Sequence, residues 1–254
     1  MSSHASLSKT PNGAGPIVSS PHPAAPSPIY PMNRPSVFPP RPSRSSRDLD
    51  QAIGGRCRGS LVGPDGRIRA FDSDSEARTT EWFLARPDVR DVIEQPPAIT
   101  YRDTDGKTRS YTFDQLVEYT DGERVLVEVK APARAASPNF QKKIRHLAAQ
   151  IPPDVAARVI VVTRRDLDRV ATDNARLINS ARKDRVQPLD ASVETYVAER
   201  SNVMTIAEIV RDLGDGRAFR SIVRLIGRGI LTPVSGASIT PALQVRYTGT
   251  EEAR

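Results

Sequence analysis

Cysteine and histidine are scarce in this sequence, which contains one cysteine, Cys57, and three histidines. A single cysteine excludes a disulfide framework and indicates a reducing compartment. With so few thiol and imidazole ligands, a structural zinc site is not expected either. No apolar run reaches the roughly 20 residues that a membrane helix needs, and the N-terminus lacks the apolar core of a secretory signal. We therefore expect a soluble, cytoplasmic protein without membrane contact.

Acidic residues are absent from residues 1–46, which hold half of the 22 prolines and many serines. Such a segment cannot bury enough apolar surface to offset the entropy lost on ordering. We predict a disordered Pro/Ser-rich tail over residues 1–48. Its arginines, among them Arg34, Arg41 and Arg44, could contact DNA or a partner, but a solvated tail is the simpler interpretation.

Basic residues are in excess over the whole chain of 254 residues, whose formal net charge is +7. Most of the excess is arginine, whose planar fork matches phosphate oxygens and guanine edges. This balance favours an anionic partner, and double-stranded DNA is the partner we expect. The length allows one medium domain followed by a small one.

Periodic patterns begin after residue 50 and predict a mixed sheet flanked by helices, an α/β fold. Ser73 and Glu76 form a capping-box pattern before a helix that ends near Pro87. A Gly-Pro-Asp-Gly turn predicts a hairpin before this helix. Further strands are expected at residues 91–93, 98–101, 108–119, 124–130 and 157–162, and further helices at 140–150 and 168–184. We place this domain at residues 49–190.

Three charged residues flank the predicted hairpin turn at Asp121-Gly122. Asp114 lies on the strand before the turn, and Glu128 and Lys130 lie on the strand after it. Because side chains alternate along a strand, Glu128 and Lys130 share a face. Charged groups on so apolar a strand are costly unless they are paired or bind something.

This pattern suits phosphodiester hydrolysis. Two carboxylates can hold a hard divalent cation, which polarises the phosphate and lowers the pKa of a bound water. A lysine beside them can orient that water or stabilise the developing charge. The alternative is a solvated hairpin with an ordinary Glu–Lys pair, since a motif this short is common by chance.

A longer set of motifs resembles the catalytic domain of TnsA-type transposon endonucleases, a branch of the restriction-endonuclease-like PD-(D/E)XK superfamily. The resemblance covers residues 59–182, about half of the chain. The matching pieces, in order, are Ser73-x-x-Glu76, Val89 with Glu94-Gln95-Pro96, Asp114, Glu128-Val129-Lys130, Val162-Thr163 and Asn174-Ala175. One departure is that the Pro-Asp-Phe of the family reads Phe113-Asp114-Gln115 here.

The resemblance implies a restriction-endonuclease-like fold and roles for the matching residues. Asp114 and Glu128 would bind Mg²⁺, with Mn²⁺ as a possible substitute, and Lys130 would be the catalytic lysine. Glu76 would complete the catalytic and metal site from its helix, with Glu81 as the alternative. Glu76 could instead serve only in the capping box.

Other polar residues near these motifs are less informative. Gln95 could face the site, but a loop glutamine before two prolines is more often structural. Lys142 and Lys143 lie on the helix at residues 140–150 and could contact DNA phosphates, or could form a solvated face. His146 on the same helix is not expected to act as a general base.

Residues 191–254 predict a small C-terminal domain that resembles a winged helix. Helices are expected at residues 192–200, 205–213 and 217–228, the last two joined by a Gly-containing turn as in a helix-turn-helix. Strand-like residues 229–231 and 244–247 would form the wing. Four arginines recur along the last helix and would contact DNA in the major groove: Arg217, Arg220, Arg224 and Arg228. The alternative is a small helical cap with a solvated basic face, and such modules also mediate protein contacts.

Together, the patterns and the resemblance predict a metal-dependent endodeoxyribonuclease. The resemblance further implies that it acts at transposon ends beside a separate transposase subunit. One alternative is a non-catalytic DNA-binding or regulatory protein that retains a nuclease-like fold. The other is a restriction or repair nuclease, which would share the site. Retention of both acids and the lysine favours an active enzyme.

Overall fold

The computed structural model describes residues 39–46, 58–184, 188–200 and 202–249. The chain divides into two units, Met1–Phe38 and Pro39–Arg254, and every described residue belongs to the second. Most of the predicted tail therefore lies outside the described residues. Within the described ranges, no helix combines the length and the apolar character needed to cross a membrane.

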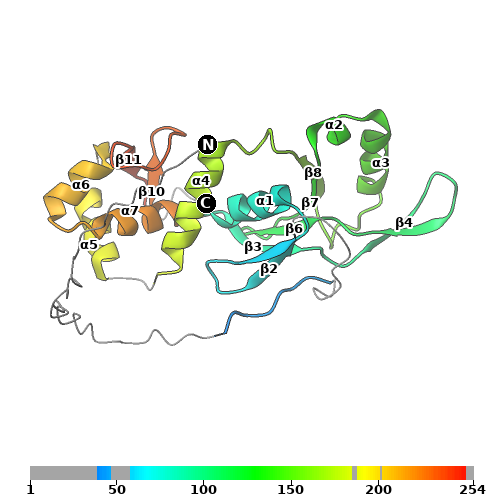
Figure 1. The fold of residues 1–254 in the computed structure, drawn as a ribbon, viewed down its shortest axis with the longest axis horizontal. Coiled ribbons are helices and arrows are strands. Elements are labelled where there is room, and N and C mark those ends of the chain that lie inside the picture. The colour runs from blue at the N-terminus through cyan, green and yellow to red at the C-terminus, as the bar shows by residue number, and fades with distance from the viewer. Residues whose placement is uncertain (1–38, 47–57, 185–187, 201, 250–254) are drawn as a thin grey trace, which may run out of the picture. The chain divides into compact units, whose positions relative to one another are not determined.

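A four-stranded mixed sheet forms the centre of the first domain (Figure 1). Its strands are β3 (Val89–Glu94), β6 (Gln115–Tyr119), β7 (Arg124–Val129) and β8 (Arg158–Val162), in the order β3-β6-β7-β8. The first two pairings are antiparallel, and β7 with β8 is parallel. The mixed sheet predicted from the sequence is confirmed, and its form is compatible with a nuclease-like fold.

Two hairpins lie outside this sheet. The first joins β1 (Gly59–Val62) to β2 (Ile68–Phe71), and the second joins β4 (Ile99–Arg102) to β5 (Thr108–Tyr111). The sequence predicted one continuous strand over residues 108–119, and this prediction is wrong. The strand breaks at residues 112–114 because β5 pairs with β4 whereas β6 pairs with β3 and β7.

Helices cover both faces of the central sheet. On one face, four valines of β6 and β7 pack with Phe83 and Leu84 of α1 (Asp74–Leu84). On the other face, Leu116 and Leu126 pack with three apolar residues of α3 (Pro138–Ala148). The remaining helices of this domain are the short α2 (Pro132–Ala135) and α4 (Arg169–Arg182).

The C-terminal domain contains three helices and a small antiparallel sheet. In chain order its elements are α5 (Pro188–Arg200), β9 (Met204–Thr205), α6 (Ile206–Leu213), α7 (Ala218–Gly227), β10 (Leu231–Pro233) and β11 (Gln244–Tyr247). The strand order is β10-β11-β9. The apolar residues of α7 are buried except for the partly buried Phe219, and the helix packs against α4, α5 and α6.

Helix α4 packs against both α1 and α7, and all described residues belong to one compact unit, so the two predicted domains are continuous through α4. The side chain of Asn179 donates to the carbonyl of Glu81 at the end of α1 (2.8 Å). On the opposite side, α4 approaches α7 so closely that a Cβ added to Gly227 would lie 2.5 Å from Ile178. The boundary predicted at residue 190 follows α4, but α4 shares one apolar core with the C-terminal helices.

Residues 39–46, which the sequence places in the disordered tail, contact the first domain in the structure. Arg41 forms a parallel β-bridge with Arg67, and its guanidinium lies 2.9 Å from the carboxylate of Asp65. Further along, Ser43 donates to Glu94, and the backbone N–H of Ser46 donates to the carbonyl of Gln95 (3.0 Å). The amino-acid composition of this segment could not predict these contacts, because each depends on a partner at least 24 residues away in the sequence.

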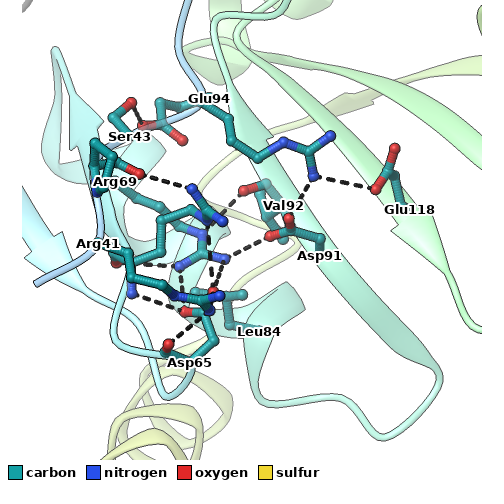
Figure 2. A network of polar contacts seen from close by, with 12 residues as sticks. Arg41, Ser43, Asp65, Arg69, Leu84, Asp91, Val92, Glu94 and Glu118 are labelled. Atoms are coloured by element: carbon teal, nitrogen blue, oxygen red, sulfur yellow. Dashed lines mark hydrogen bonds and ion pairs between the residues drawn. The ribbon is translucent and has the colours of Figure 1, made fainter.

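A buried arginine anchors the strands beneath this segment (Figure 2). The side chain of Arg69 is 1% exposed, and its guanidinium contacts the carboxylates of Asp65 (2.8 Å) and Asp91 (2.5 Å). Its Nε also donates to the carbonyl of Val92 on β3 (2.9 Å). Because each nitrogen of the guanidinium donates to an acceptor, Arg69 holds the β1–β2 hairpin against β3.

Candidate active site

Asp114, Glu128 and Lys130 meet at the ends of two adjacent strands. Asp114 immediately precedes β6, and Glu128 lies near the end of β7, in the register that pairs Gln115 with Val127. The ammonium of Lys130 lies 3.1 Å from Asp114 Oδ2 and 2.6 Å from Glu128 Oε1. The structure thus brings together the three residues that the hairpin pattern singled out.

Backbone and side-chain donors hold Asp114 in this position. Its Oδ2 accepts hydrogen bonds from the Val129 N–H (2.7 Å) and from Lys130 Nζ. These bonds cross from the residue before β6 to the end of β7. The carboxylate is therefore fixed by the pairing of the two strands rather than by a local turn.

Glu128 is the most deeply buried member of the group, with 2% of its surface exposed. Its Oε1 accepts from the hydroxyl of Tyr111 (2.5 Å) and contacts Lys130, whereas its Oε2 is buried without a hydrogen-bond partner. Burial, and then the negative charge of Asp114, raise the pKa of Glu128 above its ordinary value, although Lys130 opposes the shift. The positive charge beside this carboxylate therefore does not fully offset the cost of burying its negative charge.

Lys130 remains charged in this setting. Burial by itself lowers the pKa of its ammonium, but the carboxylates of Asp114 and Glu128 outweigh burial, so the pKa lies above its ordinary value. One ammonium group therefore contacts two carboxylates, and the formal net charge of the three side chains is negative.

Glu76 lies in the first turn of α1 and is held by the start of its own helix. The Ser73 hydroxyl caps the helix as expected, since it accepts from the Glu76 N–H (3.2 Å). The Glu76 carboxylate accepts from the Ser73 hydroxyl (2.9 Å) and from the Asp72 N–H (2.8 Å), so the reciprocal backbone bond of a capping box comes from Asp72 instead of Ser73. Burial raises the pKa of Glu76, the Asp72 hydrogen bond opposes the rise, and the charge of Asp114 adds to it. Glu76 is therefore close enough to Asp114 for their charges to interact, while it also serves as a cap.

Glu81, the alternative to Glu76, is paired with another residue. Its carboxylate lies 2.8 Å from the guanidinium of Arg176 on α4. This pairing favours Glu76 as the third acid, and the choice between the two stays a prediction.

The donor set is suited to a hard cation. Among the residues that the structure describes, no group of three His, Cys, Asp or Glu is arranged as a ready metal cage. Mg²⁺ needs no such cage, since it keeps several waters and is commonly bound through one or two carboxylates. The unpartnered Oε2 of Glu128 and the carboxylate of Asp114 provide that number of ligands.

Two polar residues of the site were missed in the sequence. Tyr111 reaches Glu128 from β5, and Gln115 on β6 is 1% exposed and donates to Thr80 (2.8 Å) and to the carbonyl of Glu76 (3.0 Å) on α1. Gln115 thereby ties the helix of Glu76 to the strand of Asp114. The sequence signal that could have identified Gln115 is its position as a polar residue between Asp114 and an apolar run.

Gln95 adopts a positive φ of 41° next to the site. Its N–H donates to the carbonyl of Asp114 (2.8 Å), and its side-chain amide donates to Asp72 (3.1 Å). These bonds agree with the structural interpretation of this residue, because they join the backbone of one candidate ligand to the loop before α1.

The predicted basic residues of α3 lie beside the site. Lys142 and Lys143 are exposed, and the ammonium of Lys143 lies 4.4 Å from the centre of the Tyr111 ring. His146 is engaged elsewhere, since its Nε2 lies 2.7 Å from the carbonyl of Arg102 on β4. The sequence contains no acidic residue between positions 131 and 153.

The four arginines predicted to bind DNA do not form one exposed face. Arg224 is buried and bonds to Asp190 (2.6 Å) and Asp184 (3.1 Å), and Arg220 bonds to Asp184 (2.6 Å). Arg224 is therefore not available to DNA, contrary to the expectation, because α7 packs into the core instead of projecting from it. Two others are exposed, Arg217, which pairs with Asp215, and Arg228.

A mixed sheet that brings two acids and a lysine together at neighbouring strand ends is the arrangement expected of a nuclease-like domain. Residues 86–152 match the family model described as the TnsA-like endonuclease N-terminal domain. The match contains Asp114, Glu128 and Lys130 and confirms the resemblance to TnsA-like endonucleases. The search of curated proteins found no match to this chain.

Proposed function

We propose that this protein is an Mg²⁺-dependent DNA endonuclease that hydrolyses a phosphodiester bond at transposon ends, together with a separate transposase. The observation that carries the proposal is the negative group formed by Asp114, Glu128 and Lys130, with the unpartnered buried oxygen of Glu128. The family match over residues 86–152 supports the class of reaction and the transposon setting.

The roles of the residues follow from their contacts. Asp114 and Glu128 would hold the divalent ion, and Glu76 would add negative charge from α1. When bound, such an ion polarises a phosphate oxygen and makes a bound water more acidic. Lys130 keeps its proton on Nζ and points into the group, so it can orient the attacking water or stabilise charge on the phosphate.

DNA phosphates would bind to the basic residues of α3. Lys142 and Lys143 are exposed there, and Arg134 and Arg145 extend the positive charge along α2 and α3. This role is supported by the contact of Lys143 with Tyr111, whose hydroxyl bonds to Glu128. Phosphate contacts of this kind position the duplex without reading its sequence.

The C-terminal domain has the element order of a winged helix, and we propose that it binds a partner protein. A DNA-reading role is weakened by the burial of α7, the helix that would enter the major groove. In addition, the segment from residue 229 to residue 245, which includes β10, the loop to β11 and the first two residues of β11, has no charged residue, and Arg246 is the one charged residue of the two wing strands. A wing with so little positive charge is poorly suited to a phosphate backbone.

A cleavage assay on a transposon-end duplex, with Mg²⁺ and the transposase present, tests the proposal. Asp114→Ala or Glu128→Ala should lower the cleavage rate at least about 100-fold, because each variant lacks one of the two proposed carboxylate ligands of the ion. DNA binding should persist in both variants. The control is Asp121→Asn, which changes an exposed carboxylate in the turn of the same hairpin.

Unchanged cleavage in either site variant would reject the proposed site. The non-catalytic alternative predicts that the wild-type protein binds DNA without cutting it in Mg²⁺ or Mn²⁺.

A further inference from the structure

Tyr111 contacts the candidate site from outside the sheet that builds it. It is the last residue of β5, which pairs only with β4 among the described strands. Its hydroxyl nevertheless donates to Glu128 Oε1 over 2.5 Å, across 17 residues of sequence. A second small sheet therefore contributes a donor to the central group.

The effect of this bond on Glu128 follows from the other contacts of the carboxylate. Tyr111 and Lys130 both reach Oε1, so two donors fix the plane of the carboxyl group, whose terminal torsion is otherwise broad. Oε2 is left buried and without a hydrogen-bond partner in the structure. Both donors thus contact one oxygen of Glu128, and the other oxygen has no donor.

The ring of Tyr111 is itself held in place. Phe113 packs against it edge to face with ring centres 5.1 Å apart, and Lys143 lies 4.4 Å from its centre. With the ring held on both sides, the hydroxyl donates to Glu128 Oε1. The side chain is a fixed donor rather than a mobile one.

We infer that Tyr111 is a positioning residue that orients Glu128 so that its Oε2 can bind the divalent ion. The inference rests on the proposed function, because it requires that Glu128 is a metal ligand. Partners that orient metal ligands matter for affinity, and their removal commonly weakens metal binding about 10–100-fold. The contact with Lys143 further joins this donor to the basic surface of α3.

Isothermal titration of the full-length protein with Mn²⁺ tests the inference without relying on catalysis. Tyr111→Phe removes only the hydroxyl and keeps the ring that Phe113 and Lys143 contact. We expect its Kd for Mn²⁺ to rise about 10–100-fold, with the KM for DNA unchanged. Tyr101→Phe, on the partner strand of the same hairpin, is the matched control and should bind Mn²⁺ like the wild type.

A double-mutant cycle with Glu128→Ala separates positioning from a general loss of structure. If Tyr111 acts through Glu128, Tyr111→Phe should cause no further loss of Mn²⁺ affinity in the Glu128→Ala background. An equal further loss there would contradict the inference, as would wild-type affinity in Tyr111→Phe alone. Circular dichroism verifies that each variant is folded.

The same titration distinguishes failure of the inference from failure of the proposed function. If the wild type binds Mn²⁺, Glu128→Ala weakens the binding, and Tyr111→Phe does not, only the role of Tyr111 is wrong. If Glu128→Ala binds Mn²⁺ as tightly as the wild type, the proposed metal site itself is wrong.

Discussion

The protein contains two groups of paired acidic and basic side chains, and positive and negative charges are balanced differently in the two groups. In the first domain, Lys130 contacts both Asp114 and Glu128. In the C-terminal domain, Arg220 and Arg224 face Asp184 and Asp190, so two cations meet two acids. The first group has an excess of negative charge, and the second has none.

Hydrogen bonding follows the same division. Both carboxylate oxygens of Asp190 accept bonds from Arg224, at 2.6 to 3.1 Å. Glu128 in contrast leaves one buried oxygen without a donor. The pKa of Asp184 is lowered, first by its bond to Arg220, whereas the pKa of Glu128 is raised, first by burial. The satisfied group stabilises the fold, and the unsatisfied oxygen of Glu128 is where we propose that a cation binds.

The largest expected effect is on stability, from Arg224→Ala. Both Arg224 and Asp190 are buried, and removal of one partner leaves the other charge unpaired, which costs about 3–5 kcal/mol. Urea denaturation should show this loss. Arg217→Ala is the control, because that side chain is 87% exposed and should have little effect.

If Arg224→Ala instead kept full stability and lost DNA binding, the structural role assigned to the C-terminal arginines would be wrong.

Glu128→Gln should have the opposite effect on stability. Because the pKa of Glu128 is raised in the fold, the metal-free protein gains stability from this group below the ordinary pKa of about 4.3 and loses it as the pH rises through the raised value. Removal of the charge should stabilise the metal-free protein by about 0.5–2 kcal/mol at pH 7.

The gain from Glu128→Gln should disappear below about pH 4, where the wild-type carboxyl is also protonated. Denaturation with a chelator present, at both pH values, measures the difference. A variant that is less stable than the wild type at pH 7 would show that Lys130 and Tyr111 fully satisfy Glu128.

The smallest effect concerns the exposed lysines of α3. Lys142→Ala with Lys143→Ala should weaken DNA binding for all sequences alike and reduce the slope of log K against log salt by about 2. Fluorescence anisotropy over a salt series measures this slope. The matched control is Lys183→Ala with Arg90→Ala, two exposed basic residues that are not predicted to contact DNA. Equal slopes in wild type and variant would exclude α3 as the phosphate-binding surface.

The parts of the structure that the sequence predicted depend on local patterns. The alternating apolar residues in β7 and the Asp-Gly turn before it were sufficient to predict that Asp114, Glu128 and Lys130 lie close together. The capping pattern at Ser73 was sufficient to begin α1. These signals lie within a few residues of the structure that they specify.

The parts that could not be predicted depend on partners distant in sequence. The spacing of Arg220 and Arg224 correctly placed them on one helix, but whether that helix faces solvent depends on Asp184, Asp190 and the packing of α4. The role of Tyr111 could not be predicted either. It depends on β5 pairing with β4, whereas β6 pairs with β3 and β7. Periodicity identifies a face of an element but not what covers it.

Crystals grown with Mn²⁺ and examined by anomalous diffraction test the central claim most directly. The account predicts one strong peak within coordination distance of both Asp114 and the free Oε2 of Glu128, and no such peak beside Asp184 or Asp190. Absence of a peak between Asp114 and Glu128 at saturating Mn²⁺, with Lys130 still bonded to both, would contradict it.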